Sequence, residues 1–541
     1  MLSIDQNCHS LWDVVPKLHA LAAAGHGVTH FIEDIDSAFT EMGADVADGG
    51  LRLARERFHR SGGADWGAAL FYTEFLGRLP VEVRRWESLT GMKTKELARK
   101  LGRSVDDLYD EFSPGDNWQL IGSSFVGDRR HHRVIGDLKV SETAGCLREM
   151  LEIARGDMLG AFPAAASRRR LAAWLDREQA LVDSLLAELA DAPLVRLYDR
   201  WMREHIPGSV PLDMTSRLFA CAASGAPGLR LLPEFLADYD RVAALYDEAV
   251  VAADVGLRPL ATAEGELPFF ATFEHEGRLV RTALHWRDGA LHAADRAVPL
   301  PGGGADLGAA LAGAGIRCVA GKAAVLVTQV RMGPAGEPLA LPHRGSLYMP
   351  AAHAFARNLA AAGLLPGELR PVVRVRLRLL DRLRSLDTPI RLPGHLAEAM
   401  GAEEVPACRL GEAHADLAAD AAGRLAAFRD EANRDRWQRE SFPEAAAEID
   451  ALDRRRRELA ARDPKAPELR DIWKRLRALQ TDRLAALVRR IDLDTQVAEL
   501  GYYDSRGAVL PWCVALGGET FYNEVVRNAE ITEEDSLRAR P

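Results

Sequence analysis

Three carboxylate side chains, Glu33, Asp34 and Asp36, stand within four positions directly behind the apolar run 28–32. That run is β-branched and aromatic, which predicts a short buried strand. Like charges this close repel each other, so they lie either in a solvated loop or helix N-terminus, or at the carboxyl end of a parallel strand. In a shared cleft they would bind an ammonium group, and one of them would titrate high enough to accept its proton. We treat them as candidate catalytic groups.

A second polar cluster follows the first predicted strand, residues 1–4. It comprises Gln6, Asn7 and His9 and precedes a predicted helix over 11–24. A strand, a helix and a second strand at this spacing form a parallel crossover unit. Both clusters would then lie at the carboxyl ends of neighbouring strands. Gln6, Asn7 and His9 are therefore candidate substrate-binding donors.

A basic patch lies between predicted strands at 118–121 and 133–138. Its candidate binding residues are Arg130 and His132, next to His131. These side chains suit an acyl phosphate or a nucleotide, although paired histidines are also common on protein surfaces. Both interpretations stay open.

The stretch "LPHRGSLYMP" places four further candidate substrate-binding residues around a glycine and ahead of a predicted helix: His343, Arg344, Ser346 and Tyr348. Ser346 would cap that helix, and a helix N-terminus attracts anions. A capped loop without a ligand explains the pattern equally well.

Alternation in the predicted strand 372–380 puts Arg374, Arg376 and Arg378 on one face. They are either solvated arginines on a half-exposed strand or a cationic wall for an anionic ligand such as a phosphate.

No metal site is evident in the sequence. His26 and His30 have i,i+4 spacing, but on a glycine-broken loop and strand rather than on one helix face. The chain lacks a Walker A sequence, a G-x-S-x-G motif and a G-x-G-x-x-G motif in a β-α context. These observations disfavour a P-loop nucleotide enzyme. Chemistry that joins an amine to a carboxyl group would instead draw on ATP or another activated acyl donor.

The composition restricts the class of protein. The chain has 541 residues, 48% of them apolar, and a net charge of -10, so no overall basic field attracts nucleic acid or membranes. Its six cysteines are scattered without paired spacing, which indicates reduced thiols. There is no apolar run long enough to span a bilayer, and the N-terminus does not resemble a signal peptide. We expect a cytoplasmic protein.

Helical patterns dominate 38–112 and 142–249. Within the first, Thr94 and Ser104 are predicted N-caps of two helices separated by a turn at Gly102. This pair resembles a helix-turn-helix, but acidic residues fill the second helix, so we expect a structural αα-hairpin and no nucleic-acid binding. Strands are predicted at 267–277, 278–286, 316–332 and 372–380.

The C-terminal third is charged, alanine-rich and helical. Ile449, Leu452, Arg456 and Leu459 step by 3-4-3, and a second segment steps by 4-3 through Ile472, Leu476 and Leu479. This spacing is typical of a coiled coil. We interpret "RRRR" at 454–457 as its solvated face. Because a long thin hairpin cannot bury its seam alone, we expect a homodimer.

Together these patterns predict an α/β fold, with a Rossmann-like parallel-sheet core, large helical insertions and a C-terminal antiparallel coiled-coil hairpin. The predicted division is 1–140 for the start of the core with a helical insertion at 40–112, 141–256 for a helical region and 257–408 for the second part of the core. A coiled-coil arm follows at 409–492, and 493–541 returns to the core.

The order of parts resembles the bacillithiol cysteine ligases, enzymes said to add cysteine to glucosaminyl-malate. "SIDQN" and "FIEDIDSAF" occupy the places of two turns of that family, and "HHRVIGDLKVSETAGCLREML" and "VALGGETFYNEVV" are similar to later segments. The resemblance implies a Rossmann-like core, a dimerising coiled coil, and Gln6, Glu33, Asp34 and Asp36 as matching site positions. Asp5 and Ile32 replace the glycines that open the two turns, and Ile35 replaces a histidine.

Two functional hypotheses follow. The first is a ligase-like enzyme that joins an amino acid, such as cysteine, to an amine-bearing small molecule or peptide. The second, suggested by the replaced glycines and histidine, is a non-catalytic dimeric scaffold or binding protein descended from such a ligase.

Overall fold

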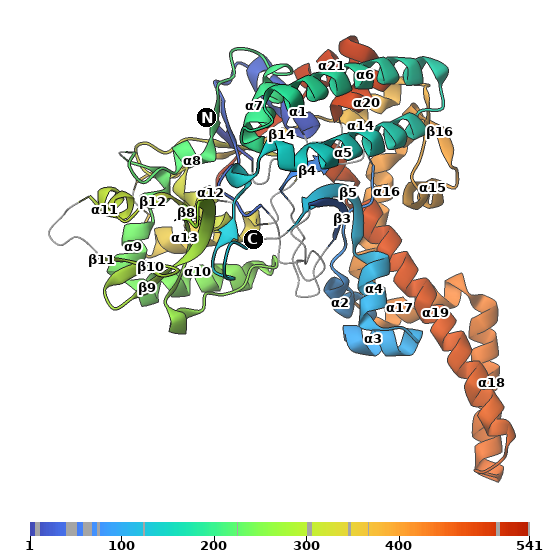
Figure 1. Cartoon of the computed structure of the whole chain (residues 1–541). Helices are drawn as coiled ribbons and strands as arrows, with labels where there is room; N and C mark the ends of the chain where they lie inside the picture. Colours follow the sequence, from blue (N-terminus) through green and yellow to red (C-terminus); the bar gives the residue numbers. More distant parts are fainter. Residues whose placement is uncertain are drawn as a thin grey trace.

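The structure is a computed structural model that describes residues 1–5, 11–38, 51–57, 68–72, 76–122, 125–223, 225–299, 306–344, 348–365, 367–504 and 509–538 (Figure 1). Four candidate residues lie outside these ranges: Gln6, Asn7, His9 and Ser346. The fold is mixed α/β around a mostly parallel sheet. None of the helices in the described ranges is long and apolar enough to cross a membrane.

The central sheet has six strands, in the spatial order β17 (Glu530–Glu534), β14 (Val372–Arg376), β13 (Leu339–Pro342), β1 (Leu2–Ile4), β2 (Thr29–Ile32) and β7 (Leu212–Met214). All neighbours pair in parallel except β17, which runs antiparallel to β14. From the β7 edge and in chain order, the strands therefore run 3-2-1-4-5-6. The direction of winding reverses between β1 and β13.

Helix α1 (Leu11–Ala23) connects β1 to β2, which confirms the predicted crossover unit. Successive side chains along the strands point to opposite faces of the sheet, and both faces are buried. Leu2, Ile4 and Phe31 belong to one core cluster, whereas Ile32 and Ala340 belong to the other. Burial on both faces is the normal condition of a parallel sheet and explains its short, apolar strands.

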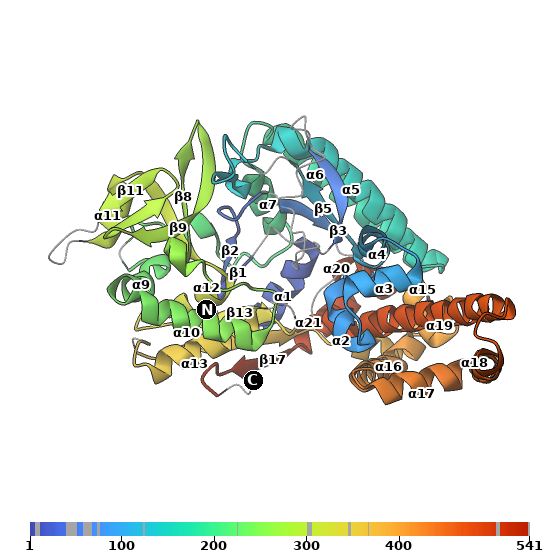
Figure 2. The same cartoon turned by 90° about the horizontal axis from the view of Figure 1, so that it is seen from below.

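A second, antiparallel sheet lies on one side of the central sheet (Figures 1 and 2). Its order is β11 (Arg296–Pro299), β10 (Ala290–Ala293), β9 (Arg278–Arg287), β8 (Glu266–His275) and β12 (Ile316–Gly321), and β6 (His132–Arg133) also pairs with β9. The β8–β9 hairpin turns at Glu276 (φ 49°) and Gly277 (φ 73°), both in the left-handed region that two-residue hairpins favour.

One group of helices packs against the antiparallel sheet and against one face of the central sheet. They are α8 (Thr215–Leu218), α9 (Leu232–Ala237), α10 (Tyr239–Ala253), α11 (Leu307–Gly313), α12 (Ala323–Gln329) and α13 (Met349–Ala361). On the other face of the central sheet, α1 packs in a cluster with long and C-terminal helices: α5 (Val140–Ala161), α6 (Ala165–Glu188), α7 (Leu194–Arg203), α20 (Val509–Leu516) and α21 (Gly518–Arg527).

The helical arm comprises α16 (Ala407–Ala427), α17 (Glu431–Ser441), α18 (Pro443–Arg462) and α19 (Glu468–Ala498). Figures 1 and 2 show α18 and the first part of α19 extending side by side away from the rest of the chain. Ile449, Ile472, Leu476 and Leu479 form a small buried cluster between them. The predicted apolar positions therefore face each other.

Smaller elements complete the chain. They are α2 (Trp86–Thr90), α3 (Thr94–Leu101), α4 (Val105–Phe112), α14 (Leu379–Arg382) and α15 (Gly394–Met400), a sheet of β3 (Arg52–Arg57), β5 (Pro114–Ile121) and β4 (Ala68–Tyr72), and the pair β15 (Pro389–Arg391) and β16 (Glu404–Pro406). Ser104 caps α4 as predicted, with its hydroxyl oxygen 3.0 Å from the amide nitrogen of Asp107. Thr94 is not an N-cap; it is the first residue of α3 and is held by Glu87.

Several predicted elements are wrong. The segment 133–138 is not a strand, because only His132–Arg133 pairs with β9 and Ile135–Asp137 forms a 3-10 turn. The segment 316–332 is β12 followed by helix α12. The region 38–112 is not wholly helical, since it contains β3 and β4. The break within 142–249 contains β7, an edge strand of the central sheet.

Candidate functional site

The three predicted carboxylates form a turn at the carboxyl end of β2. Glu33 and Asp34 are buried, with 5% and 8% of their surface exposed, whereas the Asp36 side chain is 33% exposed. Ligands of open α/β sheets bind beyond the carboxyl ends of the strands, where the winding reverses. The turn follows β2, the neighbour of β1, and so lies one strand away from that reversal.

Glu33 Oε1 accepts hydrogen bonds inside the turn. The amide nitrogens of Ile35 and Asp36 lie 2.7 and 2.8 Å away, and the Thr215 hydroxyl oxygen lies at 2.9 Å. These donors fold the chain around the carboxyl group and hold it in place.

Asp34 is anchored to the neighbouring strand. Its carboxylate accepts from the Ser216 amide at 2.7 Å and the Ser216 hydroxyl at 2.5 Å, and the Thr215 hydroxyl oxygen lies at 2.8 Å. Thr215 and Ser216 begin α8, directly after β7. Asp34 thus joins the ends of β2 and β7.

Burial governs the titration of this turn. The pKa of Glu33 is raised to about 8, because the group is buried and because Asp36 and Asp34 repel a further negative charge. Burial also raises the pKa of Asp34, against the hydrogen bonds from Ser216 and Thr215. A carboxyl group with a pKa near neutrality can both hold and release a proton under cellular conditions.

An arginine of the antiparallel sheet faces the turn. Asp36 forms an ion pair with Arg281 of β9, whose guanidinium carbon lies 3.7 Å from the centre of the Phe270 ring. The ammonium of Lys322 lies 5.1 Å from the same ring. Two cations therefore share one aromatic side chain beside the acidic turn.

Lys322 is in turn paired with buried Glu266, at 2.5 Å. Burial lowers the pKa of Lys322, and Glu266 works against this shift. Arg258 also binds Glu266, and these contacts lower the pKa of Glu266 to about 2 despite its burial. The cationic side of the site is thus fixed by a network of its own.

The segment after β6 packs directly on the turn. The amide of Ile135 donates to the carbonyl of Asp36 at 3.0 Å, and the amide of Gly136 donates to the carbonyl of Asp34 at 2.8 Å. A Cβ atom at Gly136 would lie 2.8 Å from that carbonyl oxygen, so a side chain does not fit.

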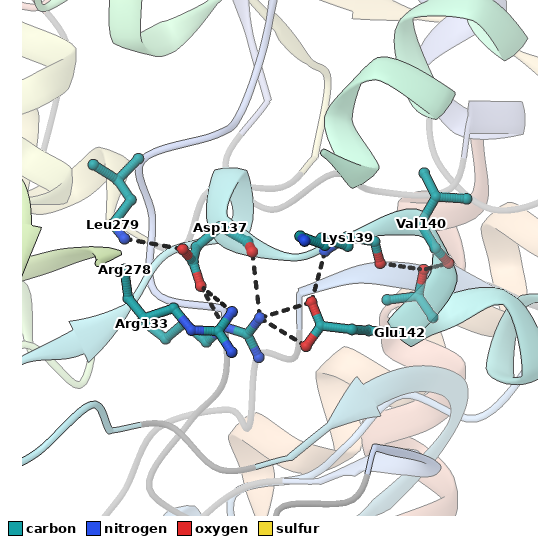
Figure 3. A network of polar contacts seen from close by, with 8 residues as sticks. Arg133, Asp137, Lys139, Val140, Glu142, Arg278 and Leu279 are labelled. Atoms are coloured by element: carbon teal, nitrogen blue, oxygen red, sulfur yellow. Dashed lines mark hydrogen bonds and ion pairs between the residues drawn. The ribbon is translucent and has the colours of Figure 1, made fainter. Parts of the chain in front are cut away.

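Figure 3 shows how this segment is held. Arg133 binds Asp137 at 2.6 Å and Glu142 at 2.9 Å, and Asp137 accepts from the Leu279 amide at 2.9 Å. Arg278 adds a contact to Asp137 at 3.3 Å. The network fastens α5 and β9 to the segment that covers the acidic turn.

The predicted basic patch is divided. His132 pairs with Arg281 in the β6–β9 ladder, and its ring lies 4.8 Å from that of Phe125, so its backbone adjoins the site. Arg130 is exposed and binds Asp128 at 2.7 Å. His131 stacks on His275 at 3.7 Å.

The connection after β13 contributes Tyr348. Its pKa is raised by burial and by the negative charge of Asp36, which puts Tyr348 on the same side of the sheet as the acidic turn. His343 and Arg344 are exposed, and Arg344 pairs with Glu499 at 3.1 Å. Although His343 is exposed, partial desolvation of its ring by the surrounding residues and the charges of Arg376, Arg344 and Arg374 lower its pKa.

The arginines of 372–380 are neither a solvated row nor an unpaired cationic wall. Arg374 binds Glu534 at 2.8 Å, and Arg376 binds the fully buried Asp504 at 2.6 Å. Arg378 lies past the end of β14 in a left-handed conformation (φ 57°) and pairs with Asp381. These contacts join β14 to β17 and to the segment after α19.

A buried polar chain lies inside the sheet behind the turn. The Ser3 hydroxyl oxygen is 2.9 Å from Nδ1 of His30, and Nε2 of His30 is 3.1 Å from the Asp5 carboxylate. All three side chains are buried, so Ser3 is not placed to act as a nucleophile. His30 is committed to these two contacts.

Sequence reasoning missed the partners of the turn, Thr215, Ser216 and Arg281, and it missed Lys322, which shares the Phe270 ring with Arg281. The only signal for Thr215 and Ser216 was the polar "DMTS" inside an otherwise helical region.

Within the described ranges, no group of three or more His, Cys, Asp or Glu side chains is placed to hold a metal ion. Comparison of the chain with protein-family models, curated proteins and solved structures gave no match.

Proposed function

We propose that the chain is a ligase-like enzyme that forms an amide bond between an amino acid, such as cysteine, and an amine-bearing small molecule or peptide. The observation that carries this proposal is the pairing of a buried carboxyl group, Glu33 with a pKa of about 8, with the half-exposed Asp36 and its partner Arg281. One side of the site is acidic and the other is cationic.

Amide formation uses both the acidic side and the cationic side of the site. An amine arrives as an ammonium ion, which Asp36 attracts and whose charge favours the ionised form of Glu33. Glu33 then accepts one proton, so the nitrogen lone pair is free to attack the acyl carbon. An α-amino group has a pKa of about 8, close to that of Glu33, so proton transfer between the two costs little free energy.

The cationic half suits the activated acyl group. Arg281 and Lys322 would bind a carboxylate or acyl phosphate and stabilise the oxyanion that forms when nitrogen attacks. The bond from carbon to the leaving oxygen then breaks, and phosphate or another leaving group departs with the electron pair. ATP or another activated acyl donor would supply that group, and Tyr348, His343 and Arg344 lie on connections close to the same sheet edge.

The proposal also includes a Rossmann-like core and a coiled-coil arm. The strand order 3-2-1-4-5-6 is that of Rossmann folds. The facing apolar positions of α18 and α19 support a coiled-coil hairpin. Pairing of this hairpin with a second copy, in a cytoplasmic homodimer, is part of the same proposal. Both features agree with a divergent relative of the bacillithiol cysteine ligases.

A thermal-shift experiment with nucleotides, cysteine and amino sugars tests whether the site binds such ligands. A ligand at a hundredfold excess over its Kd stabilises a protein by about 2.7 kcal/mol. Asp36→Asn should abolish the shift, whereas Asp183→Asn, which alters an exposed ion pair on α6, should not.

The hydrogen bonds of Glu33 and Asp34 also favour a second candidate, a dimeric scaffold whose acidic turn is structural. In that case none of the ligands would shift the melting temperature, and Asp34→Asn would unfold the protein.

A further inference from the structure

The distal part of the helical arm, residues 454–477, differs in charge from the rest of the chain. It contains ten Arg or Lys residues against four Asp or Glu residues, in a protein whose net charge is -10. All ten basic side chains are exposed except Arg456, which is half-buried. The positive charge is therefore concentrated at the end of a projection (Figures 1 and 2).

An aromatic side chain lies within this basic surface. Trp473 is 56% exposed and is the sole aromatic side chain among the large exposed hydrophobic residues of the described ranges. It points away from the buried seam, since its neighbour Ile472 and Leu476 are the residues that face α18. Apolar packing within the arm does not explain a tryptophan at this position.

The neighbours of Trp473 are cationic on both helices. Arg470 and Arg477 stand three positions before and four positions after it, so they share its side of α19. From α18, the guanidinium carbon of Arg456 lies 4.9 Å from the centre of the Trp473 ring. The result is an exposed aromatic ring bordered by three arginines.

We propose that this surface, formed by Arg456, Arg470, Trp473 and Arg477, binds RNA that presents unpaired bases. Arginines contact phosphates, and an exposed aromatic ring stacks on a base that is not held in a duplex. A duplex would satisfy the arginines but would present no free base to the exposed Trp473 ring. An acidic polypeptide would likewise need no exposed aromatic ring.

Fluorescence anisotropy of the full-length protein with a labelled 20-nucleotide single-stranded RNA tests this surface. Arg470→Glu/Arg477→Glu should weaken binding by at least about tenfold, because phosphate contacts dominate the affinity. Trp473→Ala should weaken it by about tenfold through lost stacking and should leave the salt dependence of binding unchanged. The matched control, Arg168→Glu/Arg169→Glu on the exposed face of α6, makes the same change in net charge away from the arm.

Each of several results would overturn the proposal. They are the absence of binding by the unaltered protein at low salt, an equal loss of affinity in the arm and control variants, and a Trp473→Ala variant that binds as well as the original. Tighter binding to a duplex RNA of the same length would also contradict it, because a duplex offers no free base to Trp473. The readout requires no enzymatic activity, so it is independent of the proposed ligase reaction.

Discussion

Thr215 places its hydroxyl oxygen 2.9 Å from Oε1 of Glu33 and 2.8 Å from Oδ1 of Asp34. One short side chain from the end of β7 thus lies between two buried carboxyl groups from the end of β2. The hydroxyl proton can satisfy only one of them at a time, and the Asp34 amide donates to the hydroxyl oxygen at 3.1 Å. The geometry of the acidic turn therefore depends on Thr215.

Thr215→Val should destabilise the fold, because it keeps the shape of the side chain and removes the shared donor. Leaving buried carboxyl oxygens without that donor should lower the free energy of unfolding by about 1–3 kcal/mol. Urea denaturation measures the change. Thr328→Val is the control, since that buried hydroxyl donates only to a carbonyl of its own helix, and an equal loss in both variants would contradict the role given to Thr215.

The raised pKa of Glu33 predicts a pH dependence of stability. Between the unfolded pKa of about 4.3 and the folded value of about 8, the folded state keeps a proton that the unfolded state has released. This contribution to stability is complete below the unfolded pKa and is lost as pH rises through the folded pKa. The loss from one group is at most about 1.4 kcal/mol per pH unit.

Glu33→Gln should remove this contribution. Its free energy of unfolding, relative to that of the unaltered protein, should increase steadily from pH 5 to pH 8 and then level off. Urea titrations at four or five pH values measure the difference. A difference that does not change with pH would show that Glu33 titrates at an ordinary carboxyl pKa.

Two ion pairs of the antiparallel sheet should differ in their contribution to stability. Glu266→Gln removes the buried carboxylate that pairs with half-buried Lys322 and should cost about 3–5 kcal/mol. Glu274→Gln breaks an exposed pair with Arg317 and should cost less than about 1 kcal/mol. If urea denaturation at pH 7 gives similar losses for the two variants, the network behind Lys322 is less buried than the structure indicates.

Gly136 provides a steric test of the segment that covers the acidic turn. Gly136→Ala places a methyl group 2.8 Å from the Asp34 carbonyl oxygen and should destabilise the protein by about 1–3 kcal/mol. In contrast, Gly145→Ala in the interior of α5 meets no atom within 4 Å and should stabilise it by about 0.5–1 kcal/mol. Melting temperatures that move in the same direction would contradict this packing.

The local part of the fold follows from the sequence. The β1, α1 and β2 unit was predictable because apolar runs, glycines and helical periodicity occur within one short stretch. The facing positions of α18 and α19 were predictable because side-chain spacing alone defines a helical seam. In both cases the signal lies in neighbouring residues.

The partners in the site were not predictable from the sequence. Arg281 lies about 250 positions after the acidic turn and reaches it only because the antiparallel sheet packs beside β2. Lys322, about 290 positions after the turn, reaches the Phe270 ring beside Arg281 for the same reason. Alternation within β9 shows that Arg281 is on one face of a strand, but not what that face meets. The pairing of Arg376 with Asp504 is hidden for the same reason, since the partner follows an entire helical arm.

The most direct measurement is mass spectrometric detection of condensation product. The protein is incubated with cysteine, ATP and a panel of amino sugars and other amines, and the product has the mass of both substrates minus one water. We predict a product with the unaltered protein and a rate about 10²- to 10⁴-fold lower with folded Glu33→Gln. Equal product formation by Glu33→Gln, or no product with any amine, would contradict an amide-forming site at this turn.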